Sequence, residues 1–289
     1  MVINKDILED FLKDKFSSSK INFVGEGWDS IAFIVDDNIL RFPKKNMDDY
    51  KKEQKITDFV RNDIEVQIPK IIIVDNVEYP YTTHKMLLGN GWDVEGINNK
   101  PYDLQKNFIN DCASFFNSVH KIDKNKIEKE FPGLLKIRKF KLESFDYVNK
   151  NLQPFLSDKE ISNIYNKYEN ADIFNSDDIV LLHRDFSGGN SLINKDLHLT
   201  GVFDWADANF GNRAYDFQSL YNPKYKDFLK EILHAYELKS GIHVDIEIVI
   251  KTSLVDRVNC VCWAIVSTSL GDIKEKEVKK LVKKLEWFL

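Results

Sequence analysis

The first part of the chain combines one helical and several extended hydrophobic patterns. Ile3, Ile7 and Phe11 share one face at helical spacing, so an amphipathic helix is expected over residues 3–16. Short runs rich in isoleucine, valine and phenylalanine follow, separated by Asp, Asn, Ser and Pro residues that are typical of turns. These runs predict strands at residues 21–24, 31–35, 39–42, 70–74 and 79–88, with a helix at 47–61 between the third and fourth. Short turns join the first three strands, which should therefore pair antiparallel.

Beyond the strands, most apolar residues recur at helical spacing. Phe108, Cys112 and Phe115 belong to one such series and indicate a long buried helix. Helical segments are expected at residues 102–122, 123–171, 225–239, 245–270 and 274–289. Between the two patterns lies Gly89-Asn90-Gly91, and glycine clusters interrupt regular structure. We therefore expect an N-terminal domain over residues 1–88 and a C-terminal domain over 90–289, with a hinge at 85–89.

One short stretch inside the helical part has a different pattern and carries the polar residues of most chemical interest. The run Ile179 to Leu182 predicts a buried strand that delivers the next residues to a loop. Two glycines in Ser187-Gly188-Gly189 allow that loop to turn back. Two further apolar segments, at residues 191–194 and 197–203, predict a hairpin. This order of elements is expected to bring Asp185, Asn190 and Asp204 to one place.

These three side chains suit phosphoryl transfer. Carboxylate and amide oxygens are hard ligands, of the kind that Mg²⁺ uses together with substrate phosphates. Asp185 is the candidate catalytic residue, because a carboxylate can orient an attacking hydroxyl and accept its proton. Asn190 and Asp204 are the candidate metal ligands.

The residues around this site resemble a known family. His183-Arg184-Asp185 followed by Asn190 is similar to the catalytic loop of protein kinases. The longer pattern, His-x-Asp-Phe-Ser-x-x-Asn with Gly-Val-Phe-Asp-Trp-Ala-Asp-Ala and then Tyr-Asp-Phe at 215–217, resembles the aminoglycoside phosphotransferase family more closely, and within it the 2''-phosphotransferases. The resemblance implies an α+β, two-lobed protein-kinase-like fold with an antiparallel-sheet N-lobe and a mainly helical C-lobe. It also implies ATP or GTP as phosphate donor, Mg²⁺, and a role for Asp216 in bracing the catalytic loop.

In the N-terminal part, the same resemblance implies a set of nucleotide contacts. Gly25 and Gly27 lie in the turn that would cover the phosphates, and Ser30 stands where protein kinases have a third glycine. Arg41 occupies the position of the kinase lysine that grips the α- and β-phosphates. Glu53, on the next helix, is its expected partner. An alternative phosphate ligand is Lys44, just beyond the strand.

The expected hinge supplies the remaining nucleotide contacts. The resemblance implies that backbone N–H and C=O groups between Lys85 and Leu87 bind the purine. Because backbone groups make these contacts, the identity of the side chains does not test the assignment. The alternative is an ordinary edge strand.

Composition excludes several other classes of protein. Hydrophobic residues make up 43% and charged residues 30% of the 289 residues, and no apolar run is long enough to cross a bilayer. A cytoplasmic protein with no membrane partner is therefore expected, and we also expect a monomer. The net charge of −5 and the lack of a basic stripe argue against a nucleic-acid partner. Cys112, Cys260 and Cys262 have no zinc or redox spacing, and all three are expected to be buried thiols.

The first functional hypothesis is a kinase that phosphorylates a hydroxyl of a cationic aminoglycoside, with Asp207 as a candidate acidic contact. A second keeps the reaction and changes the acceptor to a macrolide, choline or another metabolite alcohol. It depends on Arg184, whose charge would repel a polycation if it faced the acceptor. A third hypothesis is a kinase homologue that binds nucleotide without catalysis, and the arginine at position 41 is its only support.

Overall fold

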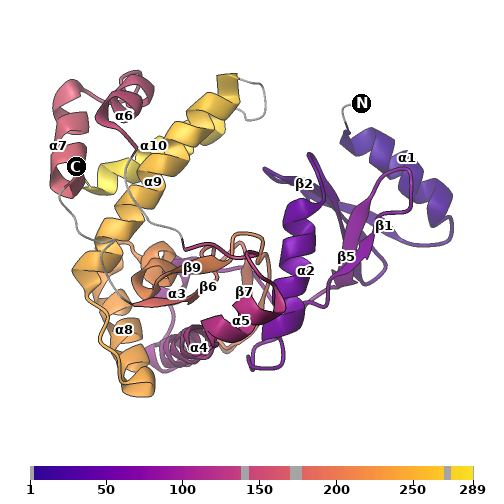
Figure 1. Ribbon diagram of the computed structural model, residues 1–289, viewed down its shortest axis with the longest axis horizontal. Coiled ribbons are helices and arrows are strands. Elements are labelled where there is room, and N and C mark those ends of the chain that lie inside the picture. The colour runs from indigo at the N-terminus through magenta and orange to yellow at the C-terminus, as the bar shows by residue number, and fades with distance from the viewer. Residues whose placement is uncertain (1–2, 138–142, 170–177, 270–274, 289) are drawn as a thin grey trace.

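The protein consists of an antiparallel sheet with two helices and a larger, mainly helical part (Figure 1). The computed structural model describes residues 3–137, 143–169, 178–269 and 275–288. Over these residues, no helix combines the length and the apolar composition that a membrane crossing requires. The expected α+β, two-lobed, protein-kinase-like fold is confirmed, with a five-stranded sheet in the N-lobe and a helical C-lobe.

The N-lobe sheet has the strand order β1-β2-β3-β5-β4, and each neighbouring pair is antiparallel. Its strands are β1 (Ile21–Glu26), β2 (Ser30–Val35), β3 (Asn38–Pro43), β4 (Ile72–Val74) and β5 (Tyr81–Lys85). One face buries Ile31 and Phe33 against helix α1 (Lys5–Lys15). Ala32, between Ile31 and Phe33, points to the opposite face of the sheet, where it is paired with Arg41 of β3. This face therefore carries the arginine predicted to bind phosphate.

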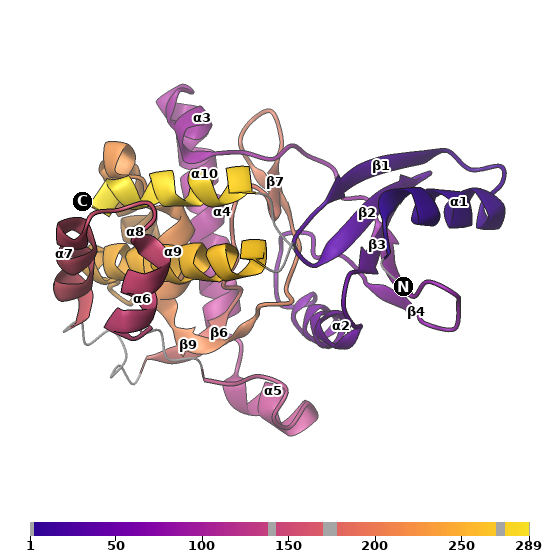
Figure 2. The same cartoon turned by 90° about the horizontal axis from the view of Figure 1, so that it is seen from above.

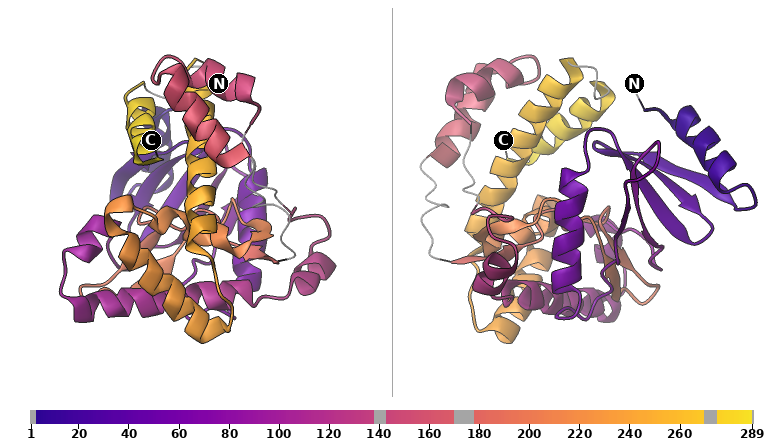
Figure 3. Two further views of the ribbon diagram at one scale, coloured as in Figure 1. Left: turned by 90° about the vertical axis from the view of Figure 1, so that its left-hand side faces the viewer. Right: turned by 45° about the vertical axis from the view of Figure 1, so that its right-hand side comes forward.

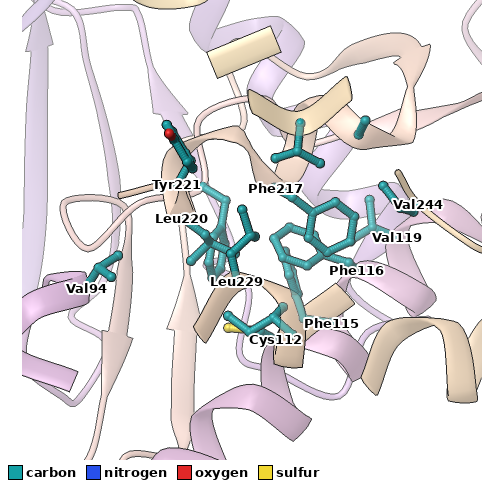
Figure 4. Close-up of a cluster of buried hydrophobic side chains, with 14 of the residues drawn as sticks. Val94, Cys112, Phe115, Phe116, Val119, Phe217, Leu220, Tyr221, Leu229 and Val244 are labelled. Atoms are coloured by element: carbon teal, nitrogen blue, oxygen red, sulfur yellow. The ribbon is translucent and has the colours of Figure 1, made fainter. Parts of the chain in front are cut away.

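The C-lobe is built around a long central helix. Its helices are α3 (Val94–Asn98), α4 (Tyr102–His120), α5 (Lys124–Glu130), α6 (Phe145–Leu152), α7 (Asp158–Glu169), α8 (Lys226–Ser240), α9 (Ile246–Ser269) and α10 (Glu275–Leu285). Short 3-10 segments cover Arg213–Leu220, Pro223–Tyr225 and Glu286–Phe288. Phe115 and Phe116 of α4 pack with Phe217 and Leu229 in one buried cluster (Figure 4). Helix α6 packs against α9 and α7 packs against α6, on the side away from the N-lobe sheet (Figure 3).

Two small sheets lie between the helical core and the N-lobe. Strand β6 (Ile179–Leu182) pairs with β9 (Asn209–Asn212), and β7 (Ser191–Ile193) pairs with β8 (Leu199–Val202). The segment after β5 pairs with β7, because Asn90 and Ile193 exchange backbone hydrogen bonds of 2.9 Å. Figure 2 shows β7 on the N-lobe side of the C-lobe. The small sheets thus present their loops to the space under the N-lobe sheet.

Several expected elements differ from those observed. The strand expected at 79–88 ends at Lys85, because the chain leaves the sheet there and Leu88 is exposed. Strand β9 was not expected, since its sequence Asn-Phe-Gly-Asn has a single large apolar residue and gains its order from pairing with β6. Helix α3 and the late start of β4, at Ile72, were also not expected. Residues 138–142, 170–171, 270, 274 and 289 of the expected helical segments lie outside the described residues. The division at a hinge over residues 85–89 stays a prediction.

We predict that two identical substitutions on helix α8 differ sharply in their effect on folding. Leu229 is fully buried, whereas Leu238 is 74% exposed. Leu229→Ala removes packed methyl groups and is expected to lower the free energy of unfolding by about 2–5 kcal/mol. Leu238→Ala is the matched control, with an expected change within about 0.5 kcal/mol. Urea denaturation checks both values, and equal effects would contradict the packing of α8 against the core.

Candidate active site

The candidate catalytic loop begins where buried strand β6 ends. His183 follows the strand, is fully buried, and links two segments of the site. The backbone N–H of Asp185 donates to its Nδ1 at 3.2 Å, so Nδ1 is the acceptor and Nε2 carries the proton. Nε2 then donates to the carbonyl oxygen of Phe203 at 3.1 Å. Burial lowers the pKa of His183, in keeping with this neutral, structural imidazole. The histidine therefore ties the loop of Asp185 to the residue before Asp204.

The carboxylate of Asp216 holds the backbone of the same loop. It is buried and accepts the N–H of His183 at 3.1 Å and the N–H of Arg184 at 2.7 Å. His120, on α4, lies 3.1 Å from the same carboxylate through Nε2 and 2.9 Å from the hydroxyl of Tyr236 through Nδ1. This is the bracing geometry that the family resemblance implied. The sequence carried no signal for the part played by His120, which comes from a distant helix.

Beyond Asp185, the loop turns back at a point where only glycine fits. A Cβ atom at Gly188 would overlap the carbonyl oxygen of Trp92, so the two backbones could not approach as they do. The Trp92 indole N–H donates to the hydroxyl of Ser191 at 2.8 Å, and that hydroxyl donates to the carbonyl of Ser187 at 2.7 Å. These contacts bring Asn190 back toward Asp185.

The three residues predicted to carry the chemistry lie near one another. The Nδ2 group of Asn190 donates to the Asp185 carboxylate at 2.5 Å and to the Asp185 carbonyl at 2.9 Å. Asp204 follows β8, with a left-handed backbone (φ 64°). Burial, together with the charges of Asp204 and Asp207, raises the pKa of Asp185 to about 7. Such a shift shows that negative charges are crowded in a poorly solvated space.

This donor set fits a Mg²⁺ ion shared with a bound nucleotide. Asn190 and Asp204 offer an amide oxygen and a carboxylate, and Mg²⁺ is typically held by one or two carboxylates plus phosphates. Within the described part of the chain, no group of three or more His, Cys, Asp or Glu side chains is arranged to hold a metal by itself. The crowding of Asp185, Asp204 and Asp207 favours a cation at this place.

On the N-lobe side, Arg41 and Glu53 form a bidentate ion pair. The guanidinium donates to Oε1 at 3.1 Å and to Oε2 at 2.7 Å, and Glu53 of α2 (Asp48–Val60) is fully buried. Burial alone would lower the pKa of Arg41, but the charges of Glu53 and Asp204 raise it above its usual range. The backbone N–H of Trp205 donates to Oε1 of Glu53 at 3.3 Å, so the pair also reaches the C-lobe. The expected partnership of Arg41 and Glu53 is present, and its role in nucleotide binding stays a prediction.

Ser30 and Lys44 flank the glycine-containing turn between β1 and β2. The carbonyl of Ser30 accepts the N–H of Gly27 at 2.9 Å, which closes the turn. Lys44 donates through Nζ to the carbonyl of Gly27 and lies close to the carboxylate of Glu26, both at 2.8 Å. Lys44 therefore supports the turn, whereas Arg41 lies deeper, against Glu53.

The residues predicted to bind the purine lie at the end of β5. The side chain of Lys85 is exposed, and its ammonium lies 3.4 Å from the carboxylate of Asp37. The Met86 N–H donates to the carbonyl of Asp37 at 2.8 Å. The side chain of Leu87 lies against Gly201 of β8, where a Cβ atom would approach it to 2.8 Å. Purine binding by the backbone of Lys85 and Leu87 stays a prediction.

Arg184, next to Asp185 in the chain, has its guanidinium against Tyr215 and Asp207. Its guanidinium lies 5.1 Å from the ring centre of Tyr215 and 3.7 Å from the carboxylate of Asp207. The Tyr215 hydroxyl is hydrogen-bonded to Asp256 of α9. Asp256 was not among the predicted site residues, although an acidic residue inside an apolar helix was a usable signal. On the same helix Cys260 is exposed, so the expectation that all three cysteines are buried is wrong.

Solved structures with the same fold extend this description. The GDP and kanamycin complex of APH(2'')-IIIa is 19% identical, with a TM-score of 0.77 over 98% of this chain and 99% of that chain. The streptomycin–ATP–APH(2'')-IIa ternary complex is 22% identical, with a TM-score of 0.66 over 99% and 97%. A macrolide 2'-phosphotransferase of type I is 17% identical, with a TM-score of 0.68 over 99% and 98%. At these identities the likeness establishes the fold alone.

A family model covers most of the same region. The model described as the phosphotransferase enzyme family, APH, matches residues 20–245. The match includes the glycine-containing turn, the Arg41–Glu53 pair, and the segment from His183 to Asp216. With the fold and this match in agreement, the chain belongs to the APH phosphotransferase enzyme family.

Proposed function

We propose that this protein is a small-molecule kinase that transfers the γ-phosphoryl group of ATP or GTP to a hydroxyl of an aminoglycoside antibiotic. The observation that carries the proposal is the position of Asp185, on a loop braced by Asp216, in contact with Asn190 and near Asp204. Phosphoryl transfer depends mainly on positioning and charge stabilisation, and this arrangement offers both.

In the proposed reaction, Asp185 orients the acceptor hydroxyl and takes its proton. The hydroxyl oxygen forms a bond to the γ-phosphorus while the bond from that phosphorus to the β,γ-bridging oxygen breaks, which releases nucleoside diphosphate. A carboxylate within hydrogen-bond reach of the hydroxyl can accept its proton as the bond to phosphorus forms. Mg²⁺ held by Asn190 and Asp204 would supply positive charge to the phosphates.

The N-lobe residues would bind the nucleotide. Arg41, oriented by Glu53, can direct a guanidinium N–H at the α- and β-phosphates. The turn that ends at Ser30 would cover the phosphates, and the backbone of Lys85 and Leu87 would contact the purine at a hinge over residues 85–89. The division of the chain into two lobes that bind the nucleotide between them is part of the proposal.

An aminoglycoside acceptor is supported by charge and by the structural relatives. Asp207 is 65% exposed beside the catalytic loop, and a carboxylate there can bind a cationic amino sugar. Arg184 is stacked on Tyr215 and lies 3.7 Å from the Asp207 carboxylate, so its charge is partly neutralised there. Two of the structural relatives are complexes with kanamycin and streptomycin.

A macrolide is the second candidate acceptor. Helix α9 exposes large apolar side chains, with Trp263 45% and Val266 38% exposed. Exposed apolar groups near a site favour a bulky, largely apolar ligand. One structural relative is a macrolide 2'-phosphotransferase.

We predict that Asp185→Asn abolishes phosphoryl transfer while nucleotide binding is retained. The amide keeps the shape of the side chain but cannot accept the hydroxyl proton, and loss of a general base costs about 10²–10⁴-fold. Single-turnover transfer and equilibrium binding of a fluorescent nucleoside diphosphate measure the two properties separately. Asp196→Asn, in the exposed turn of the β7–β8 hairpin, is the control and should leave both unchanged. Turnover at the wild-type rate in the Asp185 variant would overturn the assigned role.

We predict that Arg41→Lys raises the KM for nucleotide roughly tenfold, which corresponds to about 1.4 kcal/mol of binding free energy. Lysine keeps the charge but loses the bidentate pair with Glu53 that orients the cation. Arg61→Lys makes the same change in an ion pair with Asp58 on the surface, and steady-state kinetics should show no effect there. An unchanged KM in Arg41→Lys, with a raised KM in Lys44→Met, would assign the phosphate contact to Lys44.

The acceptor is identified by Mg²⁺-dependent release of nucleoside diphosphate from ATP and from GTP. Kanamycin, gentamicin, a macrolide and choline are tested in parallel, and we expect stimulation by the aminoglycosides. Stimulation by the macrolide alone would select the second candidate. Nucleotide binding with no stimulation by any acceptor would favour a binding protein without catalytic activity and contradict the proposal.

A further inference from the structure

The turn between β1 and β2 contacts the C-lobe through a pair of tryptophans. Trp28, at the tip of the turn, and Trp263, on α9, have ring centres 4.6 Å apart with an interplanar angle of 39°. Both side chains are partly exposed, at 43% and 45%. In Figure 2, α9 and α10 point from the C-lobe toward the N-lobe sheet. The contact therefore joins the two lobes at the open edge of the site.

The base of the same turn is anchored within the N-lobe. Lys44 donates from its backbone N–H to the carbonyl of Asp29 at 2.8 Å and from Nζ to the carbonyl of Gly27 at 2.8 Å. The Tyr50 hydroxyl lies 3.4 Å from the carbonyl of Asp29. The residues on both sides of Trp28 are therefore held to the N-lobe, while the Trp28 side chain contacts the C-lobe through Trp263.

The charges around the turn are of both signs. Burial raises the pKa of Asp29; the charge of Lys45 lowers that pKa, and the charges of Asp207, Asp49 and Asp204 raise it. The turn therefore lies within electrostatic reach of the C-lobe carboxylates. The paired aromatic rings add an attractive contact between the turn and α9.

Trp263 also lies on the face of α9 that supports the catalytic loop. Asp256 is two helical turns earlier on the same face and is hydrogen-bonded to the Tyr215 hydroxyl. Tyr215 in turn lies under the guanidinium of Arg184, next to Asp185. The helix that meets the turn is therefore the one that packs behind the catalytic residues.

We propose that Trp28 and Trp263 form an aromatic clasp that holds the β1–β2 turn closed over the nucleotide site. The clasp positions the turn and slows the departure of bound nucleotide. Neither indole takes part in the chemical step. This inference rests on the proposed nucleotide binding, and it adds a positioning pair on opposite lobes.

The first test is whether the two rings meet in solution. Stacked indoles produce an exciton-coupled circular dichroism signal, and this signal is expected in the full-length wild-type protein. It should vanish in Trp28→Ala and equally in Trp263→Ala. Survival of the signal in either variant, or its absence from the wild type, would overturn the contact. The wild-type signal should persist when mant-ADP or mant-GDP is added with Mg²⁺, and its loss would show that the clasp opens on nucleotide binding and contradict the proposal.

The second test is the dissociation rate of the same labelled nucleotides by stopped flow. Each alanine variant loses the interaction free energy of the aromatic pair. It should therefore release nucleotide roughly two- to tenfold faster than the wild type. The double variant should be no faster than the faster single variant, because both substitutions remove one interaction. Trp28→Phe and Trp263→Phe should restore much of the slow release, and Val24→Ala, an exposed apolar truncation on β1, should leave the rate unchanged.

Unchanged dissociation in the single variants, or effects that multiply in the double variant, would overturn the clasp. If the wild type bound neither labelled nucleotide, the proposed kinase function would fail. The dichroism signal would still decide whether the two tryptophans join the lobes, so the two failures are distinguishable.

Discussion

The geometry of the site depends on one buried carboxylate. Asp216 accepts two consecutive backbone N–H groups, from His183 and Arg184, and His120 lies within hydrogen-bonding distance of it. A carboxylate removed from water is costly unless donors surround it, so these hydrogen bonds stabilise both the side chain and the loop. They also offset the left-handed backbone of Arg184 (φ 73°), a conformation that costs about 1–3 kcal/mol for a residue other than glycine. Asp185 follows directly, and its direction is a consequence of this bracing.

The two lobes are joined at the site by hydrogen bonds from buried groups. His183 connects the loop of Asp185 to the carbonyl of Phe203, one residue before Asp204. On the other lobe, Glu53 holds Arg41 and accepts the N–H of Trp205, one residue after Asp204. Asp204 thus lies between a contact to the catalytic loop and a contact to the N-lobe. A change in the relative position of the lobes would disturb Arg41 and the candidate metal ligand together.

Local sequence was most informative for the candidate site residues that lie within one short stretch. Asp185, Asn190 and Asp204 lie on one strand, loop and hairpin, so their approach follows from local turn geometry. The pairing of Arg41 with Glu53 was expected from the family resemblance, which pairs a cation on the third strand with a glutamate on the next helix. Sequence was less informative for β9, whose order depends on its partner β6, and for Cys260, whose exposure depends on which face of α9 the C-lobe leaves uncovered. The sequence of an apolar helix does not indicate which of its faces will be exposed to solvent.

The sequence alone determined the class of fold, the family resemblance and the order of the residues that suit phosphoryl transfer. The helices and strands follow from the periodicity of apolar residues, and the class of fold is what the family resemblance of the motif between His183 and Phe217 implies. Only the tertiary structure decided that His120 reaches Asp216, that Arg184 lies on Tyr215 with Asp256 behind it, and that Trp28 meets Trp263. These contacts join residues far apart in the chain. Their distances are set by how whole helices and sheets pack, and no local pattern of residues specifies that packing.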